Sequence, residues 1–223
     1  MPEAELKQRL VDCIRMLEQA DIIDYNGHAS IRLDDNRILI NIGSCQRSRL
    51  TVEDICTIDM EGTLIEGKGK PPLEGHLHCG IYRARPDVKA IVHAHPKWST
   101  YLTMVGESYQ PVYAQGALLY PMPVLDSPNS INNRAMADRL AATLGDRPGA
   151  LMKSHGAVTV GKDIVEAFVL ANYMEENAHR QYMALQIGKP YAFTEEEARL
   201  CREKLWNPSL FQRTWDHFRA KLT

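Results

Sequence analysis

The sequence predicts an α/β domain in which a mixed β-sheet carries helices on its faces. Three observations predict this class: short apolar runs of strand length, amphipathic stretches of helical length between them, and no repeat, linker or low-complexity segment along the 223 residues. A chain of this length fits one large domain. We therefore expect residues 1–223 to form a single domain that ends in helices.

The N-terminal part is expected to form one helix and then two hairpins. Apolar residues recur at helical spacing through residues 5–20, which predicts an amphipathic helix. After the turn signal Asn26-Gly27, apolar runs bracket two polar turns, which predicts two β-hairpins. The four expected strands span residues 31–33, 37–42, 55–59 and 63–65.

The rest of the chain alternates between helical and extended patterns. A helix over 73–83 precedes a buried strand over 90–93, and Pro96 can begin a helix that runs to about Met104. Residues 111–125, rich in Pro, Tyr and small apolar side chains, are expected to form short strands. The remaining expected elements are a helix over 131–144 capped by Asn129 or Ser130, strands over 150–153 and 157–160, a long helix from its cap Asp163 to about Ile187, and two helices that begin near Thr194 and Pro208.

Composition excludes several classes of function. The chain has 26 basic and 28 acidic residues, and this net charge of −2 argues against a general nucleic-acid or membrane-surface binder. No apolar run reaches the length of about 18 residues that a membrane span needs, and the N-terminus lacks the pattern of a signal peptide. Five cysteines without a C-x-x-C pair indicate reduced thiols. We therefore expect a cytoplasmic protein that acts on a small molecule, with Cys79 as an apolar filler.

Three histidines and one carboxylate form the candidate reaction centre. His93 and His95 end an apolar run, and their spacing of two puts both imidazoles on one face of a strand. His155 follows a second apolar run, and Glu74 stands one helix before His93. Three imidazoles near a carboxylate are the ligand set of a catalytic divalent metal. Taken one by one, each His could instead be a surface or hydrogen-bonded residue, and His-x-His also occurs by chance.

Three motifs, in this order and spacing, resemble the class II aldolase/adducin family from the first helix to about Tyr182. They read E-x-x-x-H-x-x-I-Y-x-x-x-P-D-V from Glu74, V-H-A-H-P from Val92 and S-H-G from Ser154. The resemblance implies a three-layer αβα sandwich around a mainly antiparallel mixed sheet, and a homotetramer with sites between subunits. It also implies one divalent ion per subunit, zinc or manganese with iron or cobalt as alternatives.

In the resemblance, His93, His95 and His155 hold the metal, and Glu74 ligates the resting ion or acts as general acid/base. Adducin-like members of the family lack catalysis, and loss of a metal ligand would be the sign of such a member. All three histidines are present here, which favours an enzyme.

Departures from the family's sugar-phosphate aldolases bear on the substrate. Those aldolases look like Gly-Asn-x-Ser near the N-terminus, with a Thr-Gly turn and Ser-Ser before the Glu; the hydroxyls cradle the substrate phosphate. This chain instead has Pro72-Leu73 before the Glu, so a phosphorylated substrate is less expected. Gly-His-x-Ser-x-Arg from Gly27 is similar to the family's decarboxylases of hydroxylated aromatic acids. His28 then donates a proton or orients the substrate; alternatively it is a turn residue bonded to backbone.

Further residues are candidates for contacts with the substrate. Ser30, Gly43 and Ser44 occupy the positions of the family's substrate-binding segments. Arg47 and Arg49 follow the same turn and either clamp a carboxylate or are two solvated loop charges. Tyr113, in the segment expected to form short strands, either donates a hydrogen bond to the substrate or packs against its neighbours.

These features predict a metal-dependent carbon–carbon lyase that acts through a metal-stabilised enolate. Decarboxylation of a hydroxylated carboxylic acid, aromatic or aliphatic, is the favoured reaction. Retro-aldol cleavage of an unphosphorylated or phosphorylated hydroxy-carbonyl compound is the first alternative, and an epimerase or dehydratase on the same site is the second. The alternative without catalysis is an adducin-like binding module.

Overall fold

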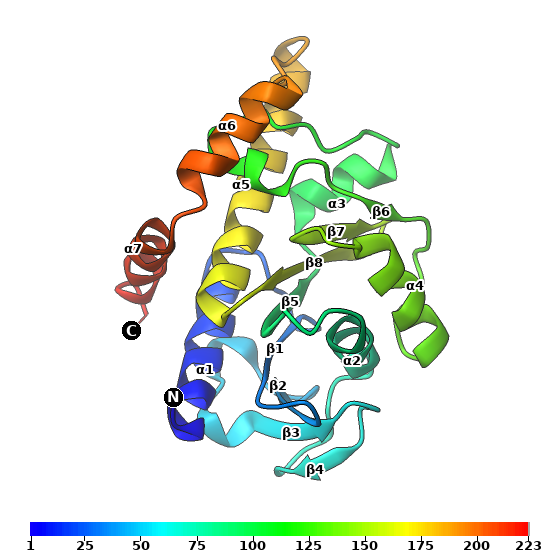
Figure 1. The fold of residues 1–223 in the computed structure, drawn as a ribbon, viewed down its shortest axis with the longest axis vertical. Coiled ribbons are helices and arrows are strands. Elements are labelled where there is room, and N and C mark those ends of the chain that lie inside the picture. The colour runs from blue at the N-terminus through cyan, green and yellow to red at the C-terminus, as the bar shows by residue number, and fades with distance from the viewer. Residues whose placement is uncertain (223) are drawn as a thin grey trace.

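A single eight-stranded sheet forms the centre of the computed structural model, which describes residues 1–222 (Figure 1). The strand order is β4-β3-β2-β1-β5-β8-β7-β6, and every pair is antiparallel except β6 with β7. The strands are β1 His28–Arg32, β2 Arg37–Asn41, β3 Ile55–Asp59, β4 Leu64–Glu66, β5 Ala90–Ala94, β6 Val124–Leu125, β7 Gly149–Met152 and β8 Gly156–Gly161.

Helices cover both faces of this sheet, which gives the three-layer sandwich that the sequence predicts. On one face α1, α3 and α5 pack in one apolar cluster, and α2 and α4 pack in a second cluster on the other face (Figure 1). The helices are α1 Glu3–Gln19, α2 Gly75–Ala84, α3 Lys97–Met104, α4 Arg134–Leu144, α5 Ile164–Ile187, α6 Glu195–Leu205 and α7 Pro208–Arg219, with 3-10 turns η1 Arg47–Arg49, η2 Val52–Asp54 and η3 Ala114–Leu119.

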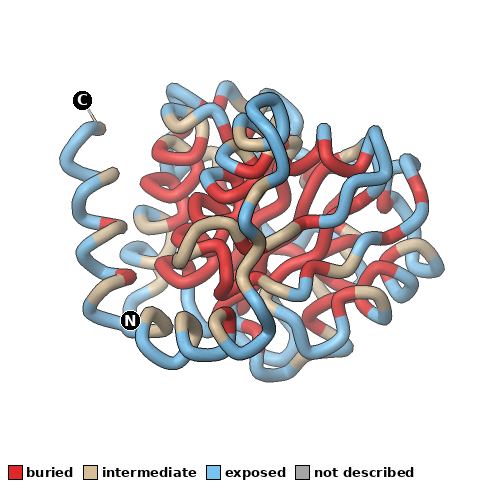
Figure 2. The backbone as a smooth tube through the Cα atoms, turned by 90° about the horizontal axis from the view of Figure 1, so that it is seen from above, coloured by how far each residue is buried: buried red, intermediate tan, exposed pale blue. Residues whose placement is uncertain are grey.

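Alternation along the strands divides the core between the two clusters. Leu39 points to the cluster of α1 and α5, whereas Ile38 and Ile40 point to the cluster of α2 and α4. The C-terminal helix α7 lies at the rim and is mostly exposed, with Phe211 and Trp215 as its buried residues (Figure 2). Within the described residues, no helix combines the length and apolar character needed to cross a membrane.

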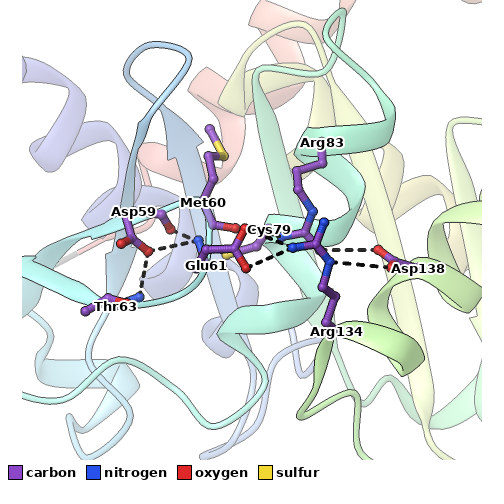
Figure 3. A network of polar contacts seen from close by, with 8 residues as sticks. All are labelled: Asp59, Met60, Glu61, Thr63, Cys79, Arg83, Arg134 and Asp138. Carbon is purple, nitrogen blue, oxygen red and sulfur yellow. Dashed lines mark hydrogen bonds and ion pairs between the residues drawn. The ribbon is translucent and has the colours of Figure 1, made fainter.

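Polar contacts tie the turn between β3 and β4 to α2 and α4 (Figure 3). Arg83 donates to the Met60 carbonyl at 2.6 Å and pairs with Asp138 at 3.2 Å, on α4. In the same network the thiol of Cys79 donates to the Asp59 carbonyl. Burial raises the pKa of Cys79 to about 12. Such a thiol stays protonated, as a packing residue does and an activated nucleophile does not.

The expectation of short strands over residues 111–125 is largely wrong. Only Val124–Leu125 forms a strand, and η3 occupies the middle of the segment. A side chain of α5 replaces the missing strand partner: the Asn177 amide oxygen accepts the backbone N–H groups of Val112 and Tyr113. The backbone is therefore satisfied without a sheet ladder, and nothing in the local sequence signals this long-range partner.

The cap predicted for α4 is also wrong. The helix begins at Arg134, and Asn133 caps it by accepting the Met136 N–H, in place of the predicted Asn129 or Ser130. The preceding segment is not helical, and within it the Ile131 N–H donates to a Glu74 carboxylate oxygen at 2.7 Å. Ile131, predicted to lie inside the helix, thus holds the Glu74 carboxylate of the candidate site.

A buried carboxylate of α5 caps α3, the helix that follows His95. The two Glu175 oxygens accept the backbone N–H groups of Trp98 at 2.7 Å and Ser99 at 3.0 Å. We predict that Glu175→Ala lowers the free energy of unfolding by about 1–3 kcal/mol, because these buried donors lose their acceptor. Urea denaturation measures this change; an unaltered midpoint would show that the cap contributes nothing, and Glu175→Gln should be the milder variant.

Candidate metal centre

Four side chains converge at one end of the sheet. Glu74 precedes α2, His93 lies in β5, His95 follows β5, and His155 lies in the turn between β7 and β8. The end of β5 pairs with the beginning of β8, which brings that turn next to the two histidines of β5. One ligand atom from each of the four residues lies within 4.8 Å of the others.

Each imidazole uses its Nδ1 to donate to a protein oxygen. Carbonyl and ionised carboxylate oxygens only accept, so this nitrogen carries the hydrogen and Nε2 keeps a free lone pair. The pairs are His93 with the Ala157 carbonyl at 3.0 Å, His155 with the Asn129 carbonyl at 3.2 Å, and His95 with the Asp24 carboxylate at 3.0 Å.

A carboxylate lies among these nitrogens. Its oxygens are 3.4 Å from His93 Nε2 and 3.5 Å from His155 Nε2. Burial raises the pKa of Glu74, but the imidazoles of His155 and His93 beside it outweigh burial and hold the pKa far below its ordinary value. Glu74 is therefore ionised and brings a negative charge to the cluster.

The arrangement fits a divalent cation. His93 Nε2 is buried without a hydrogen-bond partner, which is costly unless another group takes its lone pair. A tetrahedral zinc about 2.1 Å from its ligands separates them by roughly 3.4 Å. The Glu74 oxygens lie at that spacing from His93 Nε2 and His155 Nε2, 3.4 Å and 3.5 Å, and all four ligand atoms lie within 4.8 Å of one another. His93, His95 and His155 would hold the ion, and Glu74 can join them or stay free as a base.

Two adjoining cavities lead to this cluster. The first, about 610 Å³, is lined by His28, Glu74, His95 and His155. The second, about 940 Å³, shares Gly43 and His95 with the first and extends over the loop after β2. Both are large enough for a small polar substrate. The second is also lined by Ser44, Arg47, Arg49 and Lys97.

The two predicted arginines have different surroundings. Arg47 is 3% exposed and donates to the carbonyls of Gly27 at 2.8 Å and Cys45 at 2.5 Å, so it is no solvated charge. Its remaining amino group, Nη2, is enclosed by protein, so in this conformation Arg47 holds the loop in place. Arg49 is exposed and lines the cavity. Both arginines line the cavity, but only Arg49 is exposed there and free of bonds to the backbone carbonyls of the loop.

The structure places the other predicted residues at different distances from the cluster. His28 is buried beside His93, with ring centroids 4.9 Å apart, and lines the cavity. Ser30 lies behind His28, fully buried, and does not line it. Tyr113 lines a separate hollow, with its ring under the Arg180 guanidinium at 3.9 Å. Within one chain, Tyr113 therefore packs against α5 and is not part of the cluster.

Sequence reasoning gave no role to several residues that hold the site. Asp24 orients His95 from 71 positions away, a separation that carries no motif. His78 lies one helical turn after Glu74, and this i to i+4 spacing could have shown that both face the same side of α2. Lys97 follows the His-x-His-Pro segment and lines the cavity with Arg49.

Comparison with known proteins relates this arrangement to one family. A family model described as Class II Aldolase and Adducin N-terminal domain matches residues 8–182. An L-fuculose phosphate aldolase of Methanocaldococcus jannaschii is 28% identical over 82% of this chain and 98% of its own. A 3-oxo-tetronate 4-phosphate decarboxylase of Haemophilus influenzae is 31% identical over 78% of this chain and 84% of its own. A 3,4-dihydroxyphthalate decarboxylase of Terrabacter sp. is 28% identical over 82% and 81%.

Solved structures agree on the fold. An L-fuculose 1-phosphate aldolase from Glaciozyma antarctica superposes with a TM-score of 0.87 at 22% identity, covering 98% of this chain and 88% of its own. The L-fuculose-1-phosphate aldolase from Thermus thermophilus gives 0.73 at 28% identity, covering 85% of this chain and all of its own. The three-layer architecture is therefore shared with these enzymes.

We predict that the affinity for zinc falls as the pH is lowered, and that this fall begins above pH 6.5. Burial lowers the pKa of His155, but its hydrogen bond with Glu74 outweighs burial and raises the pKa above its ordinary 6.5. His155 is thus protonated at a pH where a free imidazole is neutral, and a protonated imidazole cannot ligate. Competition with a chromophoric chelator from about pH 8 to about pH 5.5 measures this loss. A constant affinity over that range would contradict the assignment.

We also predict that Gly156→Ala disturbs the cluster. A Cβ at Gly156 would lie 2.4 Å from the Ala94 carbonyl oxygen and 2.9 Å from a ring carbon of His95. The two strand ends must then separate, which moves His95 relative to His155. Zinc affinity should fall by about tenfold or more, since misplaced ligands lose coordination. Gly188→Ala is the control, because its Cβ meets open space; equal zinc affinity in both variants would refute the argument.

Proposed function

We propose that this metal-dependent lyase of the class II aldolase and adducin family, to which the chain belongs, decarboxylates a hydroxylated carboxylic acid. The observation that carries the proposal is His28, which shares one cavity with the metal cluster and can donate to a reacting group there. Cationic side chains line the neighbouring cavity, where an acidic substrate needs them.

The residues of the cluster have separate tasks. A divalent ion held by His93, His95 and His155 supplies positive charge beside the electron pair left when a carbon–carbon bond breaks. Zinc, manganese, iron and cobalt all suit imidazole and carboxylate ligands, and we expect zinc or manganese. When CO₂ leaves, one proton must reach the carbon that carried it. Glu74 and His28 are the groups of this chain beside the cluster that can transfer that proton.

The neighbouring cavity supports an anionic substrate. Arg49 and Lys97 line it, and a guanidinium pairs bidentately with a carboxylate. Three carboxylates, of Glu18, Asp21 and Asp24, line it too, and that of Asp24 is hydrogen-bonded to His95. We expect Arg49 to hold the carboxylate or a second acidic group of the substrate, with Gly43 and Ser44 contributing contacts along the loop.

Two of the compared proteins support this reaction class. The Haemophilus and Terrabacter relatives are decarboxylases by name, of a phosphorylated sugar acid and of a dihydroxylated aromatic acid. Aldol cleavage is the second candidate, because the aldolase of Methanocaldococcus jannaschii aligns over nearly its whole length. Product mass separates the candidates: decarboxylation releases CO₂, aldol cleavage releases an aldehyde, and an epimer keeps its mass. The homotetramer and the cytoplasmic location stay predictions.

Removal of the metal should abolish turnover. We predict that chelator-treated protein loses activity by about a hundredfold or more, and that zinc or manganese restores it, because the ion stabilises the charge of the transition state. His93→Ala should remain inactive after metal is added. His217→Ala, at an exposed histidine of α7, is the control and should keep its activity. Turnover that survives complete removal of metal would exclude this mechanism.

Arg49→Gln tests the anionic substrate. A lost charge-assisted hydrogen bond costs about 1.5–3 kcal/mol, so KM should rise by roughly 10–100-fold while kcat changes less. The assay screens aromatic and aliphatic hydroxy acids for release of CO₂. Arg139→Gln removes an exposed charge on α4 and serves as the control. Equal KM values in the two variants would remove Arg49 from substrate binding.

A further inference from the structure

Behind the metal centre, polar side chains form a continuous hydrogen-bonded chain between β1 and α2. It leads from the cavity into the core and consists of His28, His78, Ser30 and Tyr82, each at most 1% exposed. The contacts are His28 Nδ1 with His78 Nε2 at 2.7 Å, His78 Nδ1 with Ser30 Oγ at 2.6 Å, and Ser30 Oγ with Tyr82 Oη at 2.8 Å.

The hydrogen bonds of this chain can all point one way, either toward the core or toward the cavity. Both rings are buried, and among residues 1–222 no carboxylate forms an ion pair with either, so each imidazole is neutral. Each ring therefore carries one N–H, and each contact needs one donor and one acceptor. The Ser30 hydroxyl has one hydrogen and two lone pairs, so it could also accept from both neighbours, but its own hydrogen would then lack a partner among residues 1–222. That arrangement is disfavoured because it leaves a buried donor unpaired.

The tyrosine end selects the direction. Among residues 1–222, Ser30 Oγ is the one hydrogen-bond acceptor for the Tyr82 hydroxyl. If hydrogens ran toward the core, this buried hydroxyl would have no acceptor, at a cost of a lost hydrogen bond. Burial also raises the pKa of Tyr82, so the hydroxyl keeps its proton. Tyr82 therefore donates to Ser30, Ser30 donates to His78 Nδ1, and His78 Nε2–H donates to His28 Nδ1.

We propose that Tyr82, Ser30 and His78 fix His28 in its Nε2–H tautomer, so that His28 meets the substrate as a hydrogen-bond donor. His28 then stabilises negative charge on a substrate oxygen and does not act as a base in this state. Tyr82, Ser30 and His78 are positioning residues, since they act through His28. The tautomer follows from the structure alone; its effect on turnover rests on the proposed function.

Arg32, the cationic neighbour of Tyr82, is consistent with this direction of the hydrogen bonds. The Arg32 guanidinium lies over the Tyr82 ring, 4.8 Å from its centroid, and donates to the Tyr82 backbone carbonyl. Arg32 offers only donors, so it cannot accept the phenol hydrogen. Ser30 therefore stays the acceptor even with this polar neighbour.

Histidine ¹⁵N chemical shifts of the zinc-loaded protein test the proposal, because they separate protonated from unprotonated ring nitrogens. We expect His28 with Nε2 protonated and Nδ1 unprotonated. Tyr82→Phe removes the donor that selects the direction, so His28 should become a mixture of both tautomers. In the activity assay kcat should fall by about tenfold with KM nearly unchanged, since the lost donor acts on developing charge.

Tyr109→Phe is the matched control. Its hydroxyl is also buried and donates to the Gly116 carbonyl, but it lies outside the chain of His28. It should lose comparable stability and leave the tautomer unchanged. Ser30→Thr should keep the wild-type tautomer because it keeps a hydroxyl, whereas Ser30→Ala should not, which provides a second test if Tyr82→Phe folds poorly.

The outcomes are distinct. A wild-type His28 that is protonated at Nδ1 would overturn the proposal, and so would a tautomer that is unchanged in both Tyr82→Phe and Ser30→Ala. The predicted tautomers together with no release of CO₂ from any acid would leave the proposal standing and refute the proposed decarboxylation instead.

Discussion

The candidate site depends on the hydrogen bonds that three imidazoles make away from it. Each Nδ1–H is held by an oxygen of the surrounding fold, which leaves each Nε2 lone pair directed at the others. Without those bonds the rings could rotate or change tautomer, and the cluster would not present a ligand set. The site is therefore a property of the fold around it: the β5–β8 pairing supplies one acceptor, and the loops before β1 and α4 supply the other two.

Glu74, the carboxylate of the site, is likewise held by a hydrogen bond from the surrounding fold. Glu74 precedes α2, and the Ile131 N–H, in the loop before α4, fixes one of its oxygens. That loop also supplies the Asn129 carbonyl, which orients His155. One short segment thus positions both a carboxylate and a ligand imidazole. The buried chain from Tyr82 to His28 places a further imidazole beside His93, so polar groups of β1 and α2 are buried here in place of apolar side chains.

Sequence reasoning recovered what local pattern encodes. Periodicity located most of the sheet strands and the long helices, and the spacing of His93 and His95 indicated two side chains of the cluster directly. The prediction of strands over residues 111–125 failed because a distant side chain, that of Asn177, accepts backbone N–H groups that a neighbouring strand would otherwise bind. Sequence reasoning also could not separate Arg47 from Arg49, since only the fold shows that backbone carbonyls enclose one of them. Asp24, which orients His95, carries no sequence signal because 71 positions of the chain separate the two residues, although β1 and β5 are neighbours in the sheet.

X-ray absorption spectroscopy of the zinc-loaded protein tests the central claim most directly. The account predicts a first shell of three imidazole nitrogens and at least one oxygen at about 2.0–2.2 Å, with no sulfur. Sulfur at about 2.3 Å, or a shell of oxygens with fewer than two imidazoles, would contradict it, because the metal would then be bound elsewhere than at His93, His95 and His155.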